Sequence, residues 1–110
     1  MTAYAGVEDL KLALHKQRAT PEEEVVMQRC LDAAAAEIDA FLDRVDPLPD
    51  PAPAEVTETN ISRAVEWFKA SDAAYGMVGF QDIGVLKAPV DGFNRHAADI
   101  GHLKQQWGVA

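Results

Sequence analysis

The sequence predicts an all-α protein, a small bundle of about four helices with a glycine-rich apolar loop before the last helix. Two observations lead to this fold class. Proline and glycine are concentrated between candidate elements, with four of the six prolines in residues 46–56 and three glycines in residues 75–89. Apolar residues recur at the 3.6-residue spacing of an amphipathic helix in four stretches, near residues 7–16, 20–45, 58–74 and 91–107.

The composition bounds the class of protein. A chain of 110 residues forms one domain, and residues 1–110 are expected to be a single helical unit. The formal charge is −8 without any cluster of Lys and Arg, which disfavours binding to nucleic acid or to an anionic membrane. Cys30 is the only cysteine, so we expect no internal disulfide and a reducing compartment. The N-terminus has no basic stretch followed by an apolar one, so we expect an intracellular protein without a signal peptide.

The first predicted helix covers residues 7–16. Val7, Leu10 and Leu14 share one face of it, and acidic residues occupy its first turn, where the helix dipole favours them. A turn is expected to follow.

The second predicted helix covers residues 20–45 and begins with a capping box. Thr20 is the expected N-cap, Pro21 suits the first helical position, and Glu23 is expected to bond back to the N-cap backbone. Cys30 lies on the apolar stripe, so we interpret it as a buried small hydrophobe and not as a nucleophile. The stripe consists of Met27, Cys30, Leu31, Ala34, Ile38, Phe41, Leu42 and Val45.

The opposite side of this helix carries an acidic ridge, formed by Asp32, Asp39 and Asp43. Like charges one turn apart cost a few tenths of a kcal/mol. Two interpretations stay open, a solvated face or a wall that repels an anion such as DNA passing close by. A catalytic pair is the poorest interpretation, because nothing indicates that these groups are desolvated.

The third predicted helix, residues 58–74, follows a proline-rich connector at residues 46–56 that is expected to be extended. Phe68 lies on its core stripe, and Trp67 points to a neighbouring strip of mostly small or polar residues. That strip is either the edge of the protein's own core or a subunit interface. Its other members are Asn60, Arg63, Ala70, Ser71 and Ala74.

Residues 75–89 are predicted to be a glycine-rich loop. Gly76, Gly79 and Gly84 interrupt a run of large apolar residues, and glycine at this density is expected to end the helix. Loops are normally polar and exposed, so one this apolar must be covered by the chain's own helices or by another protein.

The terminal helix is predicted over residues 91–107, with Asp91 as a candidate N-cap. Trp107 lies three residues from the end of the sequence, where chains usually fray, so it is expected to dock on this subunit or on another. The apolar stripe of this helix consists of Phe93, Ala97, Ile100, Leu103 and Trp107.

The sequence lacks the patterns of common catalytic and metal sites. His96 and His102 are six residues apart, which is not the spacing of two ligands on one helix face, and one cysteine cannot complete a zinc set. No Lys-Ser or Lys-Thr pair follows the glycines as a phosphate loop requires. We therefore expect no metal, no cofactor and no enzymatic activity.

Several stretches together carry a family resemblance: V-E-D-L-K in the first helix, F-L-D-R at the end of the second, then R-A-V-E-W-F, D-A-A-Y-G-M-V-G-F-Q-D-I-G-V-L-K and Q-Q-W-G-V-A. With these stretches, nearly the whole chain resembles the head–tail connector (adaptor) proteins of tailed bacteriophages. The tyrosine/phenylalanine–glycine stretch is the most specific part. The chain departs from the family at Gln81, where the family favours another glycine, and in its proline-rich connector.

The resemblance implies a structural virion protein at the head–tail junction, present in the host cytoplasm before assembly. The family forms rings, usually of twelve subunits, that sit under the portal and extend the DNA channel towards the tail. The implied partners are other copies of the chain, the portal protein and a downstream tail or stopper protein, without specific nucleic-acid binding and without a membrane.

The resemblance also suggests uses for three sets of residues. The subunit interface would include Trp67, Tyr75, Met77, Phe80 and Ile83. The portal-binding surface would include Phe93, Ile100, Leu103 and Trp107. A channel-facing wall would include Asp32, Asp39 and Asp43 of the acidic ridge.

Two other classes of function remain as alternatives. A small acidic helical regulator, of the antitoxin or anti-activator type, would mask a basic protein partner, and the net charge suits it. Such proteins seldom need an apolar glycine-rich stretch, which argues against this class. A helical enzyme with its site between subunits is disfavoured by the lack of paired titratable groups. A neighbouring portal or capsid gene would favour the connector, and a toxin or transcription-factor gene would favour the regulator.

Overall fold

The computed structural model describes residues 3–16, 18–42, 53–83, 86–89, 91–96 and 99–101, with the backbone alone for residues 74–83. In chain order the elements are α1 (Val7–Ala13), α2 (Pro21–Leu42), α3 (Ala54–Ile83) and the 3₁₀ helix η1 (Phe93–His96). These described residues contain helices and no strand, so the prediction of an all-α fold with about four helices is confirmed.

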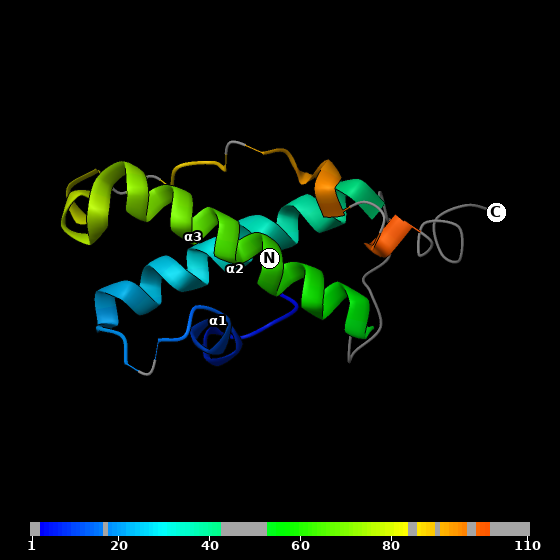
Figure 1. Ribbon diagram of the computed structural model, residues 1–110, viewed down its shortest axis with the longest axis horizontal. Coiled ribbons are helices and arrows are strands. Elements are labelled where there is room, and N and C mark those ends of the chain that lie inside the picture. Colours follow the sequence, from blue (N-terminus) through cyan, green and yellow to red (C-terminus); the bar gives the residue numbers. More distant parts are fainter. Residues whose placement is uncertain are drawn as a thin grey trace.

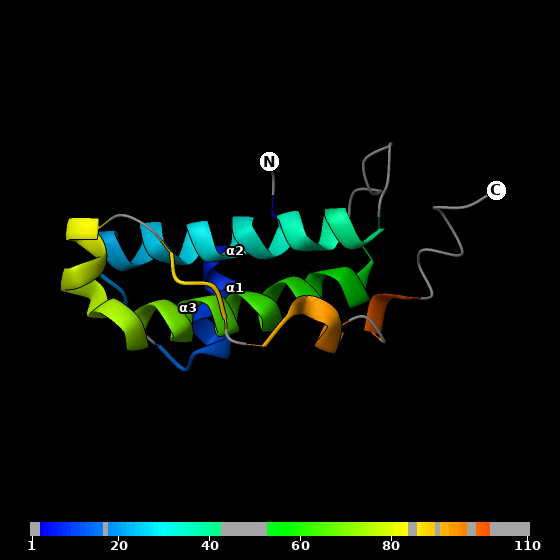
Figure 2. The ribbon, with the colours of Figure 1, turned by 90° about the horizontal axis from the view of Figure 1, so that it is seen from above.

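The bundle is built on α2 and α3, which run side by side in opposite directions (Figures 1 and 2). The short helix α1 packs across this pair. Residues 86–89 return alongside α3, where the backbone N–H of Lys87 donates to the hydroxyl of Ser71 at 2.9 Å. This return brings η1 next to the first half of α3.

Helix α1 ends at Ala13, three residues before the predicted end, because the chain closes it with a Schellman motif. His15 has a φ of 59°, in the left-handed region. The N–H of His15 donates to the carbonyl of Leu12 at 3.1 Å, and the N–H of Lys16 donates to the carbonyl of Lys11 at 2.9 Å. These two bonds satisfy carbonyls that the helix end would otherwise leave unpaired.

Helix α2 begins with the predicted capping box. The N–H of Glu23 donates to the Thr20 hydroxyl at 3.1 Å, and the N–H of Thr20 donates to the Glu23 carboxylate at 3.2 Å. Lys16 pairs with the same carboxylate at 2.9 Å, and this hydrogen bond, followed by the bond from the Thr20 N–H, lowers the pKa of Glu23. The predicted start of this helix is confirmed.

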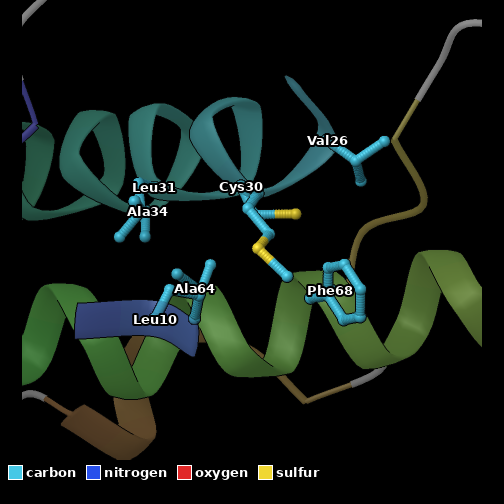
Figure 3. Packing of buried hydrophobic residues seen from close by; sticks show 8 residues of the cluster. Leu10, Val26, Cys30, Leu31, Ala34, Ala64 and Phe68 are labelled. Atoms are coloured by element: carbon cyan, nitrogen blue, oxygen red, sulfur yellow. The ribbon is translucent and has the colours of Figure 1, made fainter. Parts of the chain in front are cut away.

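An apolar cluster joins α1, α2 and α3 (Figure 3). Cys30 is fully buried in it, as predicted, and this burial raises the pKa of its thiol to about 12. A thiol with that pKa is almost entirely protonated at neutral pH, so Cys30 serves packing and not nucleophilic chemistry. The members of the apolar cluster are Leu10, Val26, Met27, Cys30, Leu31, Ala34, Ala64 and Phe68.

Helix α3 corrects two predictions. It starts at Ala54, inside the predicted extended connector, directly after Pro53, whose carbonyl accepts from Val56 at 3.0 Å. It also continues to Ile83, so the predicted loop at residues 75–89 is wrong for residues 75–83. Glycine weakens a helix by up to about 1 kcal/mol per residue relative to alanine, but each added residue also contributes a backbone hydrogen bond. Gly76 and Gly79 are therefore tolerated within α3.

The predicted terminal helix begins differently from the expectation. Residues 93–96 form the 3₁₀ helix η1, and residues 99–101 have α-helical conformation. The carboxylate of Asp91, the candidate N-cap, contacts the Arg95 guanidinium at 3.2 Å, and its capping role stays a prediction. The remainder of the predicted helix, with Leu103 and Trp107, lies outside the described residues.

Candidate functional site

Charged side chains from three parts of the chain meet beside the apolar core. We call this group the charged cluster and call residues 91–101 the C-terminal segment. The cluster lies where the segment passes α2 and α3, and its members are Glu37 of α2, Arg63 and Glu66 of α3, and Asp91, Arg95 and His96 of the segment.

Arg63 is the centre of this group, with a side chain only 3% exposed. Its guanidinium forms a two-pronged contact with the Glu37 carboxylate at 2.8 and 2.9 Å. It also donates to Glu66 at 2.8 Å and to the backbone carbonyl of Asp91 at 2.8 Å. The hydrogen bonding of Arg63 to the Glu37 carboxylate is the largest reason why the pKa of Arg63 is raised. A buried guanidinium with four acceptors fixes the relative positions of three elements.

Glu66 contacts three basic side chains. Besides Arg63, the Arg95 guanidinium lies 2.8 Å from one carboxylate oxygen and His96 Nε2 lies 3.1 Å from the other. Burial raises the pKa of Glu66, but hydrogen bonds from Arg63 and His96 and the charge of Arg95 lower it by more. The pKa of Glu66 therefore lies below its usual value, and the carboxylate is charged at neutral pH.

Trp67, predicted at a subunit interface, contacts its own chain. Its indole N–H donates to the Glu37 carboxylate at 2.7 Å, and its ring packs against the apolar cluster while staying partly exposed. Asn60, Arg63 and Ser71 of the same strip are buried, so this part of the strip belongs to the protein's own core. The interface role of Trp67 stays a prediction. The side chains of Tyr75, Met77, Phe80 and Ile83 lie outside the described residues.

The two predicted portal-binding residues that the structure describes face inward. Ile100 is fully buried in a second apolar group with Ile38, Leu42 and Val56. Phe93 is half-buried, with its ring centroid 5.8 Å from that of Phe41.

The acidic ridge is only half-exposed where the structure describes it. The Asp32 carboxylate accepts from the Gln28 amide at 3.0 Å, and the Asp39 carboxylate accepts from the Tyr4 hydroxyl. Asp43 lies outside the described residues. Whether the ridge faces a channel or solvent stays a prediction.

An open cleft lies between the first turns of α3 and the C-terminal segment. Among the described residues, its lining carries three carboxylates and two hydroxyls. The lining residues are Ala54, Glu55, Glu58, Thr59, Ser62 and Asp99.

Two features of the described residues bear on the class of site. Within those residues, no group of three or more His, Cys, Asp or Glu side chains is arranged to hold a metal ion. None of the helices in the described part of the chain combines the length and apolar character that crossing a membrane requires.

The electrostatics of Arg63 and Glu66 suit an attachment between elements of the chain. The shifted pKa values of Arg63 and Glu66 both favour the charged forms, whereas acid–base catalysis at neutral pH uses pKa values near 7. Sequence reasoning missed the cluster. The one local signal was the spacing of Arg63 and Glu66, three residues apart on a helix, which allows a direct pair.

Comparison of the chain with models of known protein families, with curated proteins and with solved structures finds no match. The resemblance to phage adaptors therefore rests on the sequence stretches alone.

Proposed function

We propose that the protein is a structural virion protein, a head–tail adaptor that forms an oligomeric ring between the portal and the tail and extends the DNA channel. The observation that carries this proposal is the run from Arg63 to Lys87, R-A-V-E-W-F continuing into Y-G-M-V-G-F-Q-D-I-G-V-L-K, which resembles the adaptor family. The partners are other copies of the chain, the portal and a downstream tail or stopper protein.

Physical features of the described residues are compatible with an assembly role. The charged groups of the cluster are paired within the chain, and the electrostatics favour attachment over catalysis. Trp67 is partly exposed at the edge of the core, where an aromatic side chain suits a protein contact. A heterologous contact between copies closes into a ring only if the rotation per subunit is right, so we expect the portal to template the ring.

The test mixes the protein with the portal protein encoded beside it and examines the product by negative-stain electron microscopy. We expect closed rings on the portal and weak association of the protein alone. Trp107→Ala should keep the helical circular dichroism spectrum and most of the melting temperature but lose portal attachment, because buried aromatics often contribute about 2 kcal/mol or more at an interface. Leu12→Ala is the matched control, since Leu12 is 76% exposed on α1.

Two outcomes would contradict this function. The first is a protein that stays monomeric beside its portal. The second is a Trp107→Ala variant that unfolds while any folded remainder still binds, which would place the portal-binding surface elsewhere, with the Tyr75–Leu86 stretch as the next candidate.

A second candidate is the small acidic regulator that masks a basic protein. The observation that favours it is the cleft lined by Glu55, Glu58 and Asp99, because a basic side chain complements three carboxylates. Capture of a toxin or transcription factor encoded beside the gene, with loss of binding on Glu58→Lys, would support this function over the adaptor.

A further inference from the structure

The C-terminal segment is attached to the helical pair mainly through polar contacts with two residues of α3. Arg63 donates to the Asp91 carbonyl at 2.8 Å. Glu66 pairs with Arg95 at 2.8 Å and with His96 at 3.1 Å. Arg63 and Glu66 lie about one helical turn apart and are themselves paired at 2.8 Å. A single short stretch of α3 therefore carries these attachments.

The apolar contribution of the segment is small beside that of the helices. Among its described residues, Ile100 alone is a fully buried hydrophobe, and Phe93 is half-buried. The Phe93 ring also contacts the charged cluster. The Arg63 guanidinium lies 5.9 Å from the centroid of this ring, and the centroid of the His96 ring lies 5.7 Å from it. The apolar cluster, in contrast, joins α1, α2 and α3 without any described residue of the segment.

These two observations indicate that polar contacts hold the segment, whereas apolar packing holds α1, α2 and α3 together. Charge-assisted hydrogen bonds contribute more than neutral ones, and removing one partner of a buried set leaves the others unpaired. Loss of the Glu66 charge weakens in one step the contacts that join Arg95 and His96 to α3, yet the contact between Arg63 and Glu37 remains. The segment then keeps the Arg63 bond to the Asp91 carbonyl but loses its side-chain attachments to Glu66, while α2 and α3 stay joined.

We propose that Glu66 is a latch that holds the C-terminal segment on α3, and that the segment is released from an otherwise intact helical bundle when this latch opens. The use of the latch in assembly rests on the proposed function. Phe93 and Ile100, the described residues of the proposed portal-binding surface, face their own chain, so binding through them requires release of the segment.

The test is amide hydrogen exchange, followed by mass spectrometry, on the full chain without any partner. In Glu66→Gln, which keeps the side-chain shape, peptides covering residues 91–101 should exchange about tenfold faster or more, while peptides from residues 26–38 of α2 stay unchanged. Glu22→Gln is the matched control, because Glu22 is an exposed acid in the first turn of α2 and belongs to neither the charged cluster nor the cleft. It should behave like the wild type.

A second measurement covers the case in which Glu66→Gln fails to fold. Arg95→Gln removes the partner on the segment side, and the Arg95 side chain is 57% exposed, so its loss does not endanger the core. It should speed exchange of residues 91–101 by a smaller factor. Raising NaCl from about 0.05 M to 1 M should speed the same exchange in the wild type, since exposed charge pairs are screened.

The proposal is overturned if residues 91–101 keep wild-type exchange in both variants. It is also overturned if α2 loosens as much as the segment, which would make Glu66 a support of the whole fold. Portal binding plays no part in this readout. A functioning latch without portal attachment would reject the adaptor function and leave the latch standing.

Discussion

The apolar cluster around Cys30 and the charged cluster around Glu66 hold two parts of one small bundle by different forces. The apolar cluster buries side chains from α1, α2 and α3, and burial of this kind is non-directional and insensitive to salt. The charged cluster relies on directed contacts to partly exposed groups such as Arg95. The comparison indicates an apolar part and a charged part that lie beside each other, and we expect salt and acid to loosen the charged part while the apolar part stays intact.

The largest expected effect is in the apolar cluster. Leu31 is fully buried, so Leu31→Ala should lower the free energy of unfolding by about 3 kcal/mol through lost burial and the resulting cavity. Urea unfolding followed by circular dichroism measures this loss, which should be the same at low and high salt. The exposed Leu12→Ala should stay within about 0.5 kcal/mol of the wild type. Equal losses in the two variants would remove the distinction on which the comparison depends.

A smaller and more local effect is expected in the charged cluster. Arg63→Ala leaves the Asp91 carbonyl without its Arg63 donor and leaves Glu37 with the Trp67 indole as its donor. The cost should be about 2 kcal/mol, below the range for a fully buried pair because 26% of the Glu37 side chain is exposed. Arg95→Ala is the control from the same cluster and should cost less than about 1 kcal/mol. Thermal unfolding gives both values. A larger loss for Arg95→Ala would show that exposed contacts contribute most of the stability of the charged cluster.

The smallest effect is expected on acidification. The pKa of Glu66 is lowered in the folded state, so its charge stabilises the fold at pH values above 4.5, the ordinary value, and this contribution disappears as the pH falls through the lowered pKa. Amide NMR signals of residues 91–96 should therefore change below about pH 4.5 before those of α2. Glu66→Gln should lack this early step. An identical titration in that variant would assign the step to Glu37 or Asp91.

The sequence predicted those parts of the fold that depend on neighbours along the chain. The capping box of Thr20 and Glu23 is a local pattern, and it occurs as expected. The burial of Cys30 followed from its place in a periodic stripe. Local rules failed at Gly76 and Gly79, where glycine was expected to end a helix that in fact continues to Ile83.

The charged cluster could not be predicted from local patterns, because its residues are far apart in the sequence. Glu37 and Arg63 are 26 residues apart, and Glu66 and His96 are 30 apart. Their pairing depends on the antiparallel packing of α2 and α3 and on the return of the chain past Ser71, neither of which has a local signature. The sequence placed Arg63 on the strip beside Trp67, but only the fold shows that this strip is covered by the chain itself.

Cys30 is an intrinsic probe for the unfolding of the protein. A thiol that is fully buried and has a pKa of about 12 cannot react with a disulfide reagent until the helices around it separate. With a single cysteine in the chain, each molecule reports one event and no engineered label is needed. The rate at which a disulfide reagent labels Cys30 in the wild-type protein therefore reports global opening of the bundle. Detachment of the C-terminal segment alone leaves this rate unchanged.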